Sequence, residues 1–470
     1  MLTISLNELL KVTGGKLWND AKEKGNQTRA RGVSIDSRTI KKGNLFVAIP
    51  GERFDGHQFV SEAADKGASL MIISKEKMNQ VKKKGLKGIP VVLVEDTKKA
   101  LRDIASWHRS KFEVPTVAVT GTNGKTTTKD MIAEVLSSKF KILKSIKSYN
   151  NLVGVPLTLF ELNPDIQVLV LELGMSNPGE IGILTRTVKP NFGVITNIGP
   201  AHLESMESLE RITQAKFELL DYMSSPGTSV LNADDEFLAK RIKDGRGKII
   251  SFAIENQADF EANDLTVTDE GYIGFRVNGK LNINLKLLGE HNVYNALAAF
   301  AVGSLLGVEE EKIKGRLERY EPSELRMEPI RLGNIKIIND SYNANPVSMA
   351  NALKTLRQMK SEGRKIAVLG DMLELGEKTF DYHWELGRSV AESRIDLLLT
   401  VGKHSPTIGQ GAQESGMNRK KIFAFENNEK ASSYLLDNLE SGDLVLIKGS
   451  RRMRLEEVVL SLKSFLGRQN

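Results

Sequence analysis

The chain has 470 residues, of which 40% are hydrophobic and 27% charged, and it carries a formal net charge of +7 at pH 7. At roughly 100 to 200 residues per domain, this length predicts about three domains and excludes a single small module. The sequence contains no cysteine, which excludes a disulfide framework, a thiolate metal site and a cysteine nucleophile.

Charge and hydropathy narrow the class of protein further. No run reaches the about 18 consecutive apolar residues of a membrane span, and the first residues lack the basic and apolar regions of a signal peptide. We therefore expect a cytoplasmic protein without membrane insertion. Acidic residues are interspersed with the lysines along most of the chain, so the positive surplus predicts a general attraction for anions and no nucleic-acid partner.

Three segments follow one another along the chain. Residues 1–113 contain short β-like runs between polar and glycine-rich turns, which predicts a small α/β domain. In residues 114–322, short apolar runs alternate with helical patterns and indicate a mainly parallel sheet covered by helices, with an antiparallel hairpin at Asn278-Gly279. The pattern restarts in residues 323–470 and predicts a second doubly wound, Rossmann-like α/β domain.

The stretch Val117–Met131, VAVTGTNGKTTTKDM, contains a phosphate-binding loop of unusual form. Gly124, Lys125 and Thr126 stand in the order that binds a triphosphate and magnesium, but Val119 occupies the place of the usual first glycine. A strand is predicted before the loop and a helix over 127–140 after it. Backbone N–H groups and a helix N-terminus therefore converge here, which favours phosphate.

A carboxylate partner for the magnesium is expected at the end of a neighbouring strand. The run IQVLVLELGMS places Glu172 after several apolar residues, where an unpaired carboxylate would be costly. The alternative is an acid that merely emerges at a strand end. We favour the paired interpretation because the loop requires a second magnesium ligand.

Five further positions are ambiguous when taken singly. His202 follows a predicted strand, and Lys216 lies in a predicted helix, where most lysines are surface residues. Asn292 and Asn295 share one helix face, and Asp340 ends a strand. Asn at a helix start and Asp at a strand end are more often caps and turn formers than ligands.

Taken in order, these segments resemble the Mur ligase family, a group of ATP-dependent, amide-forming enzymes of peptidoglycan precursor synthesis. The resemblance rests on GTNGKTT, LELG, TNIGPAHLE with AK further on, GEHNVYNALAA, SELRME and NDSYNANP, and it covers essentially the whole chain. The family's loop also lacks the first glycine, so Val119 is allowed. The resemblance implies three domains: a UDP-binding domain, a P-loop ATPase-like domain and a last, Rossmann-like ligase domain.

The flanking segments resemble one type within that family. Residues 34–60 are similar to the UDP-binding domain of the enzymes that add the third and fourth components, a domain that folylpolyglutamate synthases lack. The Asp-Asn-Pro-Arg tetrapeptide of the enzymes that add diaminopimelate or lysine is absent from the sequence. The segments 149–159, 340–349, 369–376 and 445–456 resemble the type that adds D-alanyl-D-alanine.

This resemblance implies an activity, cofactors and partners. ATP would phosphorylate the terminal carboxylate of UDP-N-acetylmuramoyl-tripeptide, and the amine of D-alanyl-D-alanine would attack the acyl phosphate, giving the pentapeptide, ADP and phosphate. ATP and Mg2+ are the expected cofactors, the two substrates are small molecules, and a monomer is expected. Because the loop and the last segment lie in different domains, we expect the site to be complete only when domains close.

The resemblance also assigns residues. The catalytic set would be Lys125, Glu172, His202, Lys216 and Arg326. Nucleotide contacts would come from Gly121, Thr122, Asn123, Gly124, Lys125, Thr126, Thr127, Asn292, Asn295, Arg326 and Asp340. Ser34, Asp36, Ser37 and Arg38 would bind the uridine diphosphate, Asn343 and Asn345 would lie near the dipeptide, and Asn150 and Asn151 would also contact substrate. Magnesium would be held by Thr126, Glu172 and His202, and by Lys216 if it is carbamylated as in relatives.

Two alternatives stay open at the level of sequence. A sibling ligase would add a single amino acid in place of the dipeptide, and a P-loop nucleotide-binding regulator would turn over ATP without any UDP-linked peptide. The sequence leaves undecided whether the third residue of the tripeptide is lysine or diaminopimelate, and whether Lys216 is carbamylated.

Overall fold

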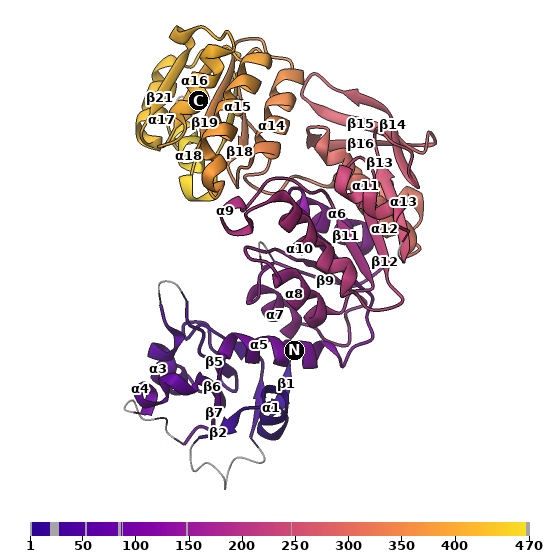
Figure 1. Ribbon diagram of the computed structural model, residues 1–470, viewed down its shortest axis with the longest axis vertical. Helices are drawn as coiled ribbons and strands as arrows, with labels where there is room; N and C mark the ends of the chain where they lie inside the picture. The colour runs from indigo at the N-terminus through magenta and orange to yellow at the C-terminus, as the bar shows by residue number, and fades with distance from the viewer. Residues whose placement is uncertain are drawn as a thin grey trace.

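The computed structural model describes residues 2–18, 28–51, 54–82, 86, 88–146, 149–245 and 247–466. Its main feature is a succession of three large sheets along the long axis, with the chain passing from one end of the molecule to the other (Figure 1). The predicted three-part α/β architecture with mixed sheets is confirmed. None of the helices in these residues has the length and apolar character needed to cross a membrane.

The first sheet has five strands in the order β2-β7-β6-β5-β4, with β2 antiparallel and the rest parallel. A separate antiparallel pair, β1 with β3, lies beside it. The elements are β1 (Thr3–Ser5), α1 (Leu6–Thr13), β2 (Lys16–Leu17), β3 (Arg29–Arg31), β4 (Val33–Ser34), β5 (Leu45–Val47), η1 (Gly56–Phe59), α3 (Val60–Asp65), β6 (Leu70–Ser74), η2 (Lys75–Lys77), α4 (Met78–Lys82), β7 (Val91–Val94) and α5 (Thr97–Arg109).

The central sheet has nine strands in the order β16-β15-β14-β13-β12-β11-β8-β10-β9. Its strands are parallel from β9 to β14, and β14, β15 and β16 are antiparallel, with the predicted hairpin between β15 and β16. The strands are β8 (Thr116–Thr120), β9 (Ile142–Lys144), β10 (Val168–Glu172), β11 (Phe192–Ile195), β12 (Thr228–Asn232), β13 (Lys248–Ala253), β14 (Phe260–Val267), β15 (Tyr272–Val277) and β16 (Leu281–Leu288).

Helices cover both faces of the central sheet, as continuous apolar strands require. One hydrophobic core contains Leu169, Leu171 and Ile195, and the other contains Val117, Val119 and Val170, so alternate residues of one strand face opposite sides. The helices are α6 (Lys125–Ser137), α7 (Gly154–Phe160), α8 (Glu180–Val188), α9 (Leu203–Met206), α10 (Leu209–Asp221), α11 (Glu236–Lys243), α12 (His291–Leu305) and α13 (Glu310–Arg319).

The last sheet has six strands in the order β17-β18-β22-β19-β20-β21, parallel except for β17. Its elements are β17 (Glu328–Leu332), β18 (Ile335–Asp340), α14 (Pro346–Gln358), β19 (Lys365–Gly370), η3 (Gly376–Lys378), α15 (Thr379–Glu392), β20 (Leu397–Val401), α16 (Pro406–Glu414), η4 (Arg419–Lys421), β21 (Ile422–Phe425), α17 (Asn428–Asn438), β22 (Leu444–Lys448), η5 (Arg451–Met453) and α18 (Glu456–Leu466).

The helix α5 connects the first sheet to the central one. Its buried residues Leu101 and Ile104 belong to the same hydrophobic core as Leu159 of α7 and Leu184 of α8. At its end, the buried guanidinium of Arg109 donates to the carbonyl of Val188 at 3.1 Å. The junction between the two sheets is thus a packed helix and not a loose linker.

Candidate functional site

The loop Gly121–Gly124 joins β8 to α6 at the carboxyl edge of the central sheet. Gly121 and Gly124 have φ angles of 146° and 77°, which L side chains rarely adopt. A Cβ at Gly121 would lie 1.9 Å from Thr196 Oγ1, and one at Gly124 would lie 2.4 Å from Asn295 Oδ1. Both glycines are therefore required by the backbone and by their neighbours. The following helix begins at Lys125, two residues before the predicted start.

Lys125 folds back over this loop. Its Nζ donates to the carbonyl oxygens of Gly121 and Thr122, at 2.9 Å in both cases. Burial lowers the pKa of Lys125, and the nearby Glu172 carboxylate partly opposes that shift. A phosphate would accept a charge-assisted hydrogen bond from this buried ammonium, and such a bond is stronger than one to a neutral carbonyl. The geometry therefore suits the predicted contact with ATP phosphates.

Thr126 and Glu172 meet beside the loop. The Thr126 hydroxyl donates to Glu172 Oε2 at 2.8 Å, and Asn150 Nδ2 donates to Glu172 Oε1 at 2.7 Å. Arg326 Nη2 donates to the Thr126 hydroxyl oxygen at 3.0 Å. Because Glu172 is only 2% exposed, its carboxylate needs these partners. The strand-end acid is thus a paired, buried group and does not merely emerge from the sheet.

Oxygen atoms of Thr126 and Glu172 are ligands of the kind that magnesium prefers. Within the described ranges, no cluster of three or more His, Asp or Glu side chains could hold a metal ion. Magnesium usually binds through one or two carboxylates together with substrate phosphates and water. The residues present therefore fit a magnesium ion that is completed by the nucleotide, and they do not fit one held by protein side chains alone.

Lys216, on α10, is 4% exposed, unlike most helical lysines. Burial and the positive charge of Lys125 hold the pKa of Lys216 well below its ordinary range. More of this amine is therefore uncharged at neutral pH. The uncharged amine is the form that reacts with CO2 to give a carbamate, so the environment supports the modification that the family resemblance implies.

His202 directly precedes α9 and contacts the last sheet. Its Nδ1 lies 2.5 Å from Glu374 Oε2, a residue of the loop after β19. Burial lowers the pKa of His202, and the negative charge of Glu374 opposes that shift. This contact joins segments from two different sheets, and it was not predicted from the sequence.

Asn292 and Asn295 share one face of α12, as predicted, and form a chain of hydrogen bonds. Asn295 Oδ1 accepts from Thr128 Oγ1 at 2.9 Å, and Asn295 Nδ2 donates to Asn292 Oδ1 at 2.9 Å. Asn292 Nδ2 donates to the carbonyl of Leu288 at 2.8 Å. Both amides are buried. They brace α12 against α6, and their direct contact with a nucleotide stays a prediction.

The last sheet contributes Asp340 at the end of β18. Its Oδ2 accepts from Lys448 Nζ at 2.6 Å, and the same ammonium donates to the carbonyl of Asn343 at 2.9 Å. The guanidinium of Arg326 lies 3.7 Å from the ring centroid of Tyr342. Aromatic stacking therefore holds Arg326 in the orientation from which it reaches Thr126.

Asn345 joins the last sheet directly to the phosphate loop. Its Oδ1 accepts from Ser348 N at 2.9 Å and so caps α14. Its Nδ2 donates to Asn123 Oδ1 at 2.8 Å, and Asn123 Nδ2 donates back at 3.3 Å. Asn345 thus contacts the phosphate loop, and its place near the dipeptide stays a prediction. Asn151 Oδ1 accepts from the N–H of Gly154, the first residue of α7, at 2.8 Å.

These groups line one cavity of about 1020 Å3, which is bordered by both the central and the last sheets. It brings together most of the predicted site residues: Gly121, Thr122, Asn123, Gly124, Lys125, Thr126, Thr127, Asn150, Asn151, Glu172, His202, Lys216, Asn292, Asn295, Arg326, Asp340, Asn343 and Asn345. Residues that lie far apart in the sequence therefore converge on one space large enough for a nucleotide and a second ligand.

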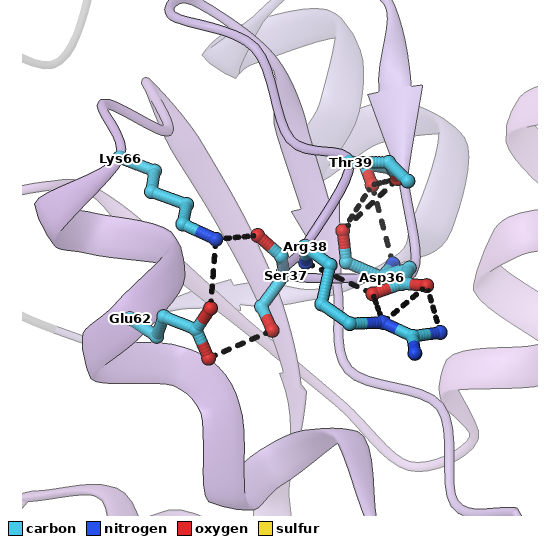
Figure 2. A network of polar contacts seen from close by, with 7 residues as sticks. Asp36, Ser37, Arg38, Thr39, Glu62 and Lys66 are labelled. Carbon is cyan, nitrogen blue, oxygen red and sulfur yellow. Dashed lines mark hydrogen bonds and ion pairs between the residues drawn. The ribbon is translucent and has the colours of Figure 1, made fainter.

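The four predicted uridine-diphosphate residues lie elsewhere, at the end of β4 and in the turn that follows it. Asp36 Oδ2 accepts from Arg38 Nη2 at 2.7 Å, and this pairing lowers the pKa of Asp36. Ser37 Oγ donates to Glu62 Oε2 at 2.9 Å (Figure 2). Ser34 Oγ donates to the carbonyl of Asp36 at 2.8 Å. Hydrogen bonds within this turn and to α3 thus hold it in place, and Ser34, Asp36, Ser37 and Arg38 are not among the residues lining the cavity.

Three groups at or beside the cavity were missed from the sequence. Lys448 ends the apolar strand β22, a strand-end position like those of Glu172 and Asp340. Asp234 accepts the Tyr294 hydroxyl at 2.9 Å and lines the cavity. Glu374 lies in a glycine-flanked loop, where no local pattern distinguishes it from other exposed acids.

Comparisons with known proteins agree with this geometry. Family models match three successive parts of the chain: the Mur ligase family catalytic domain over residues 29–109, the Mur ligase middle domain over 119–303, and the Mur ligase glutamate ligase domain over 325–451. The UDP-N-acetylmuramoyl-tripeptide–D-alanyl-D-alanine ligase of Bacillus subtilis is 34% identical over 464 residues, which cover 98% of this chain and 99% of that protein. The Escherichia coli enzyme of that name is 33% identical, with coverages of 98% and 99%.

Solved structures of MurF enzymes are also similar to this chain over nearly its whole length. MurF from Acinetobacter baumannii superposes with a TM-score of 0.89 at 30% identity and covers 99% of both chains. The MurF ligase from Thermotoga maritima in complex with ADP has a TM-score of 0.83 at 27% identity, covering 96% of this chain and 100% of that one. The phosphate loop, the buried acid and the three sheets define an ATP-dependent ligase, and the chain belongs to the Mur ligase family.

Proposed function

We propose that this chain joins D-alanyl-D-alanine to UDP-N-acetylmuramoyl-tripeptide, with conversion of ATP to ADP and phosphate. The single observation that carries the proposal is the cavity in which the phosphate loop, the buried Glu172 and residues of the last sheet face one another. The relatives that cover nearly the whole chain have this activity in their names.

The chemistry requires activation of a carboxylate. An oxygen of the tripeptide carboxylate attacks the γ-phosphorus, the bond to ADP breaks, and an acyl phosphate forms. The dipeptide amine then loses a proton and attacks the acyl carbon, and phosphate leaves. Negative charge collects at the phosphates in both steps, so positioning and electrostatic stabilisation are the main contributions of the protein.

Different residues of this chain would neutralise the phosphates, hold magnesium and contact the dipeptide. Lys125 and Arg326 place two cations at the phosphate loop, where Lys125 contacts the carbonyl of Gly121 and Arg326 contacts the Thr126 hydroxyl. Thr126 and Glu172 would hold magnesium with the nucleotide, and the ion would supply further neutralisation of phosphate charge. Lys216, if carbamylated, would also be a magnesium ligand. His202 would bind magnesium nearer the acyl phosphate. Asn343 and Asn345 would face the dipeptide.

The remaining assignments complete the proposal. The uridine diphosphate would bind at Ser34, Asp36, Ser37 and Arg38, with domains bounded at residues 1–113, 114–322 and 323–470. One family-model match falls within each of these ranges, and no sheet crosses from one range into another among the described residues, which supports the bounds. We expect a monomer, and a cytoplasmic location because ATP is drawn from that compartment.

Phosphate release tests this function. Purified protein is incubated with Mg-ATP, UDP-N-acetylmuramoyl-tripeptide and D-alanyl-D-alanine, and each component is omitted in turn. We expect release only with all three, together with a UDP-pentapeptide detected by mass. A sibling ligase would accept a single amino acid in place of the dipeptide, and release without any UDP-substrate would contradict the family's chemistry for this chain. Lysine- and diaminopimelate-containing tripeptides are compared in the same assay.

A further inference from the structure

His202 and Glu374 form a contact across the boundary between the central and the last sheets. The distance between His202 Nδ1 and Glu374 Oε2 is 2.5 Å. A second hydrogen bond reinforces it, because Glu204 N donates to the carbonyl oxygen of Glu374 at 3.2 Å. The loop that follows β19 is therefore held both to the side chain of His202 and to the backbone of α9.

Both residues of the pair have an uncommon backbone conformation. The φ angles are 54° for His202 and 64° for Glu374, in the left-handed region that few residues other than glycine occupy. Such conformations are strained and persist only where surrounding contacts enforce them. Here the backbone on each side of the boundary is bent so that the two side chains meet.

The loop that carries Glu374 is fixed on its own side as well. Met372 N donates to His383 Nε2 at 3.0 Å, and Leu373 N donates to Ser450 Oγ at 2.9 Å. The side chains of Met372 and Leu375 are buried in the core of the last sheet. The loop that carries the Glu374 carboxylate is therefore held firmly against the last sheet.

Stability alone does not account for the contact. The side chains of His202 and Glu374 are 34% and 48% exposed, and ion pairs at that exposure contribute little to stability. A histidine that serves as a ligand, however, usually donates its other ring N–H to a carboxylate or carbonyl, which fixes its tautomer and orientation. His202 lines the cavity, whereas Glu374 stands behind it.

We propose that Glu374 is a positioning residue for His202. With the last sheet docked, its carboxylate accepts the Nδ1–H of His202 and leaves Nε2, with its lone pair, as the ring nitrogen available to the cavity. The contact thereby links docking of the last sheet to the orientation of His202. The inference rests on the proposed function, in which His202 serves the magnesium that accompanies the substrates.

Histidine NMR tests the orientation directly. The chain contains six histidines, so a sample labelled with 15N at the imidazoles gives few signals, and His202→Gln identifies those of His202. At a single fixed pH, we expect His202 to be the Nδ1–H tautomer in the parent protein. Glu374→Ala should shift it toward the Nε2–H tautomer that histidine favours in water, whereas Glu374→Gln should retain the Nδ1–H tautomer because an amide oxygen still accepts.

Glu377→Gln is the matched control, since Glu377 is an exposed acid three positions further along the same loop. It should leave the His202 tautomer unchanged. An unaltered tautomer in Glu374→Ala, or an equal change in Glu377→Gln, would overturn the proposal. Loss of the Nδ1–H tautomer of His202 in Glu374→Gln would also overturn the proposal. The tautomer would then depend on the negative charge of Glu374 and not on a hydrogen-bond acceptor.

Metal affinity and kinetics give the second readout. Titration of Mn2+ in the presence of ADP should show about 10- to 100-fold weaker binding in Glu374→Ala, the usual range for loss of such a partner. The kcat should fall by a similar factor with the KM for ATP little changed, and Glu377→Gln should match the parent. If the parent protein shows no ligase activity, the proposed function fails, while the tautomer measurement still decides whether Glu374 orients His202.

Discussion

At the scale of single residues, the site depends on groups whose neighbours leave little freedom. Gly124 illustrates this, since its φ is 77° and an added Cβ would lie 2.4 Å from Asn295 Oδ1. Lys216 illustrates it differently, because its burial and the positive charge of Lys125 lower its pKa. Each case leads to a measurable consequence.

Gly124→Ala should weaken ATP binding by tenfold or more, measured by calorimetry with a non-hydrolysable analogue. The substitution combines backbone strain with a clash against Asn295 at the phosphate loop. Gly179→Ala is the matched control, because Gly179 also has a positive φ, of 85°, but a Cβ there meets nothing within 4 Å. Equal nucleotide affinity in Gly124→Ala and the parent would show that the loop tolerates the side chain.

Lys216 should form a carbamate near neutral pH. In 13C-bicarbonate, the parent protein should show one protein-bound carbamate signal, and Lys216→Arg should lose it because a guanidinium does not react. We expect that variant to lose activity by about 100-fold or more, since it replaces an anion by a cation in the catalytic region. A persistent carbamate signal in Lys216→Arg would assign the modification to another amine.

At the scale of elements, short polar contacts fix the loops at the carboxyl ends of the strands. The loop after β19 depends on His383, which is fully buried. His383 Nε2 accepts from Met372 N at 3.0 Å and Nδ1 donates to the carbonyl of Thr379 at 2.6 Å. That pattern requires the neutral ring, and burial lowers the pKa of His383 below its ordinary value.

This burial gives the last sheet a predictable pH dependence. Because the folded pKa of His383 is lower than the unfolded one, the contribution of His383 to stability is complete above about pH 6.5. It is lost as the pH falls through the folded pKa. Urea unfolding between pH 7.5 and about 5 should therefore show a shallower decline for His383→Gln than for the parent. At pH 7.5 the variant should be about 1 to 3 kcal/mol less stable, since buried hydrogen bonds are lost. If the free energy of unfolding fell equally with pH in His383→Gln and in the parent, His383 would not be the origin of the pH dependence.

At the scale of the whole molecule, the central and last sheets already meet around the cavity. Arg326 with Thr126, and Asn345 with Asn123, join them at the phosphate loop. The first sheet lies at the other end of the molecule (Figure 1). A UDP-linked peptide held at the turn of Ser34–Arg38 must still reach the cavity.

Ligand binding should therefore compact the protein in two unequal steps. In small-angle X-ray scattering, an ATP analogue alone should change the radius of gyration little, and the analogue with the UDP-linked tripeptide should reduce it as the first sheet moves toward the cavity. Ser37→Ala with Arg38→Ala, which weakens the expected UDP contacts, should require more substrate for the same change. An unchanged profile with both ligands would contradict closure.

The sequence by itself determined those features that depend on neighbours along the chain. The loop with Gly124 and Lys125, the strand-end acids Glu172 and Asp340, and the hairpin at Asn278 follow from local patterns, because a strand end or a tight turn imposes its chemistry on a few adjacent residues. Motif order then identified the family.

Only the tertiary structure decided which distant residues meet. Arg326 and Thr126 are 200 positions apart, and His202 and Glu374 are 172 apart. Local periodicity carries no information about such pairs, and it cannot show that a helical lysine such as Lys216 is buried, since both depend on how separate sheets pack. The physical reason is that a side chain's charge state and partners are set by everything that surrounds it, and most of those surroundings come from elsewhere in the chain.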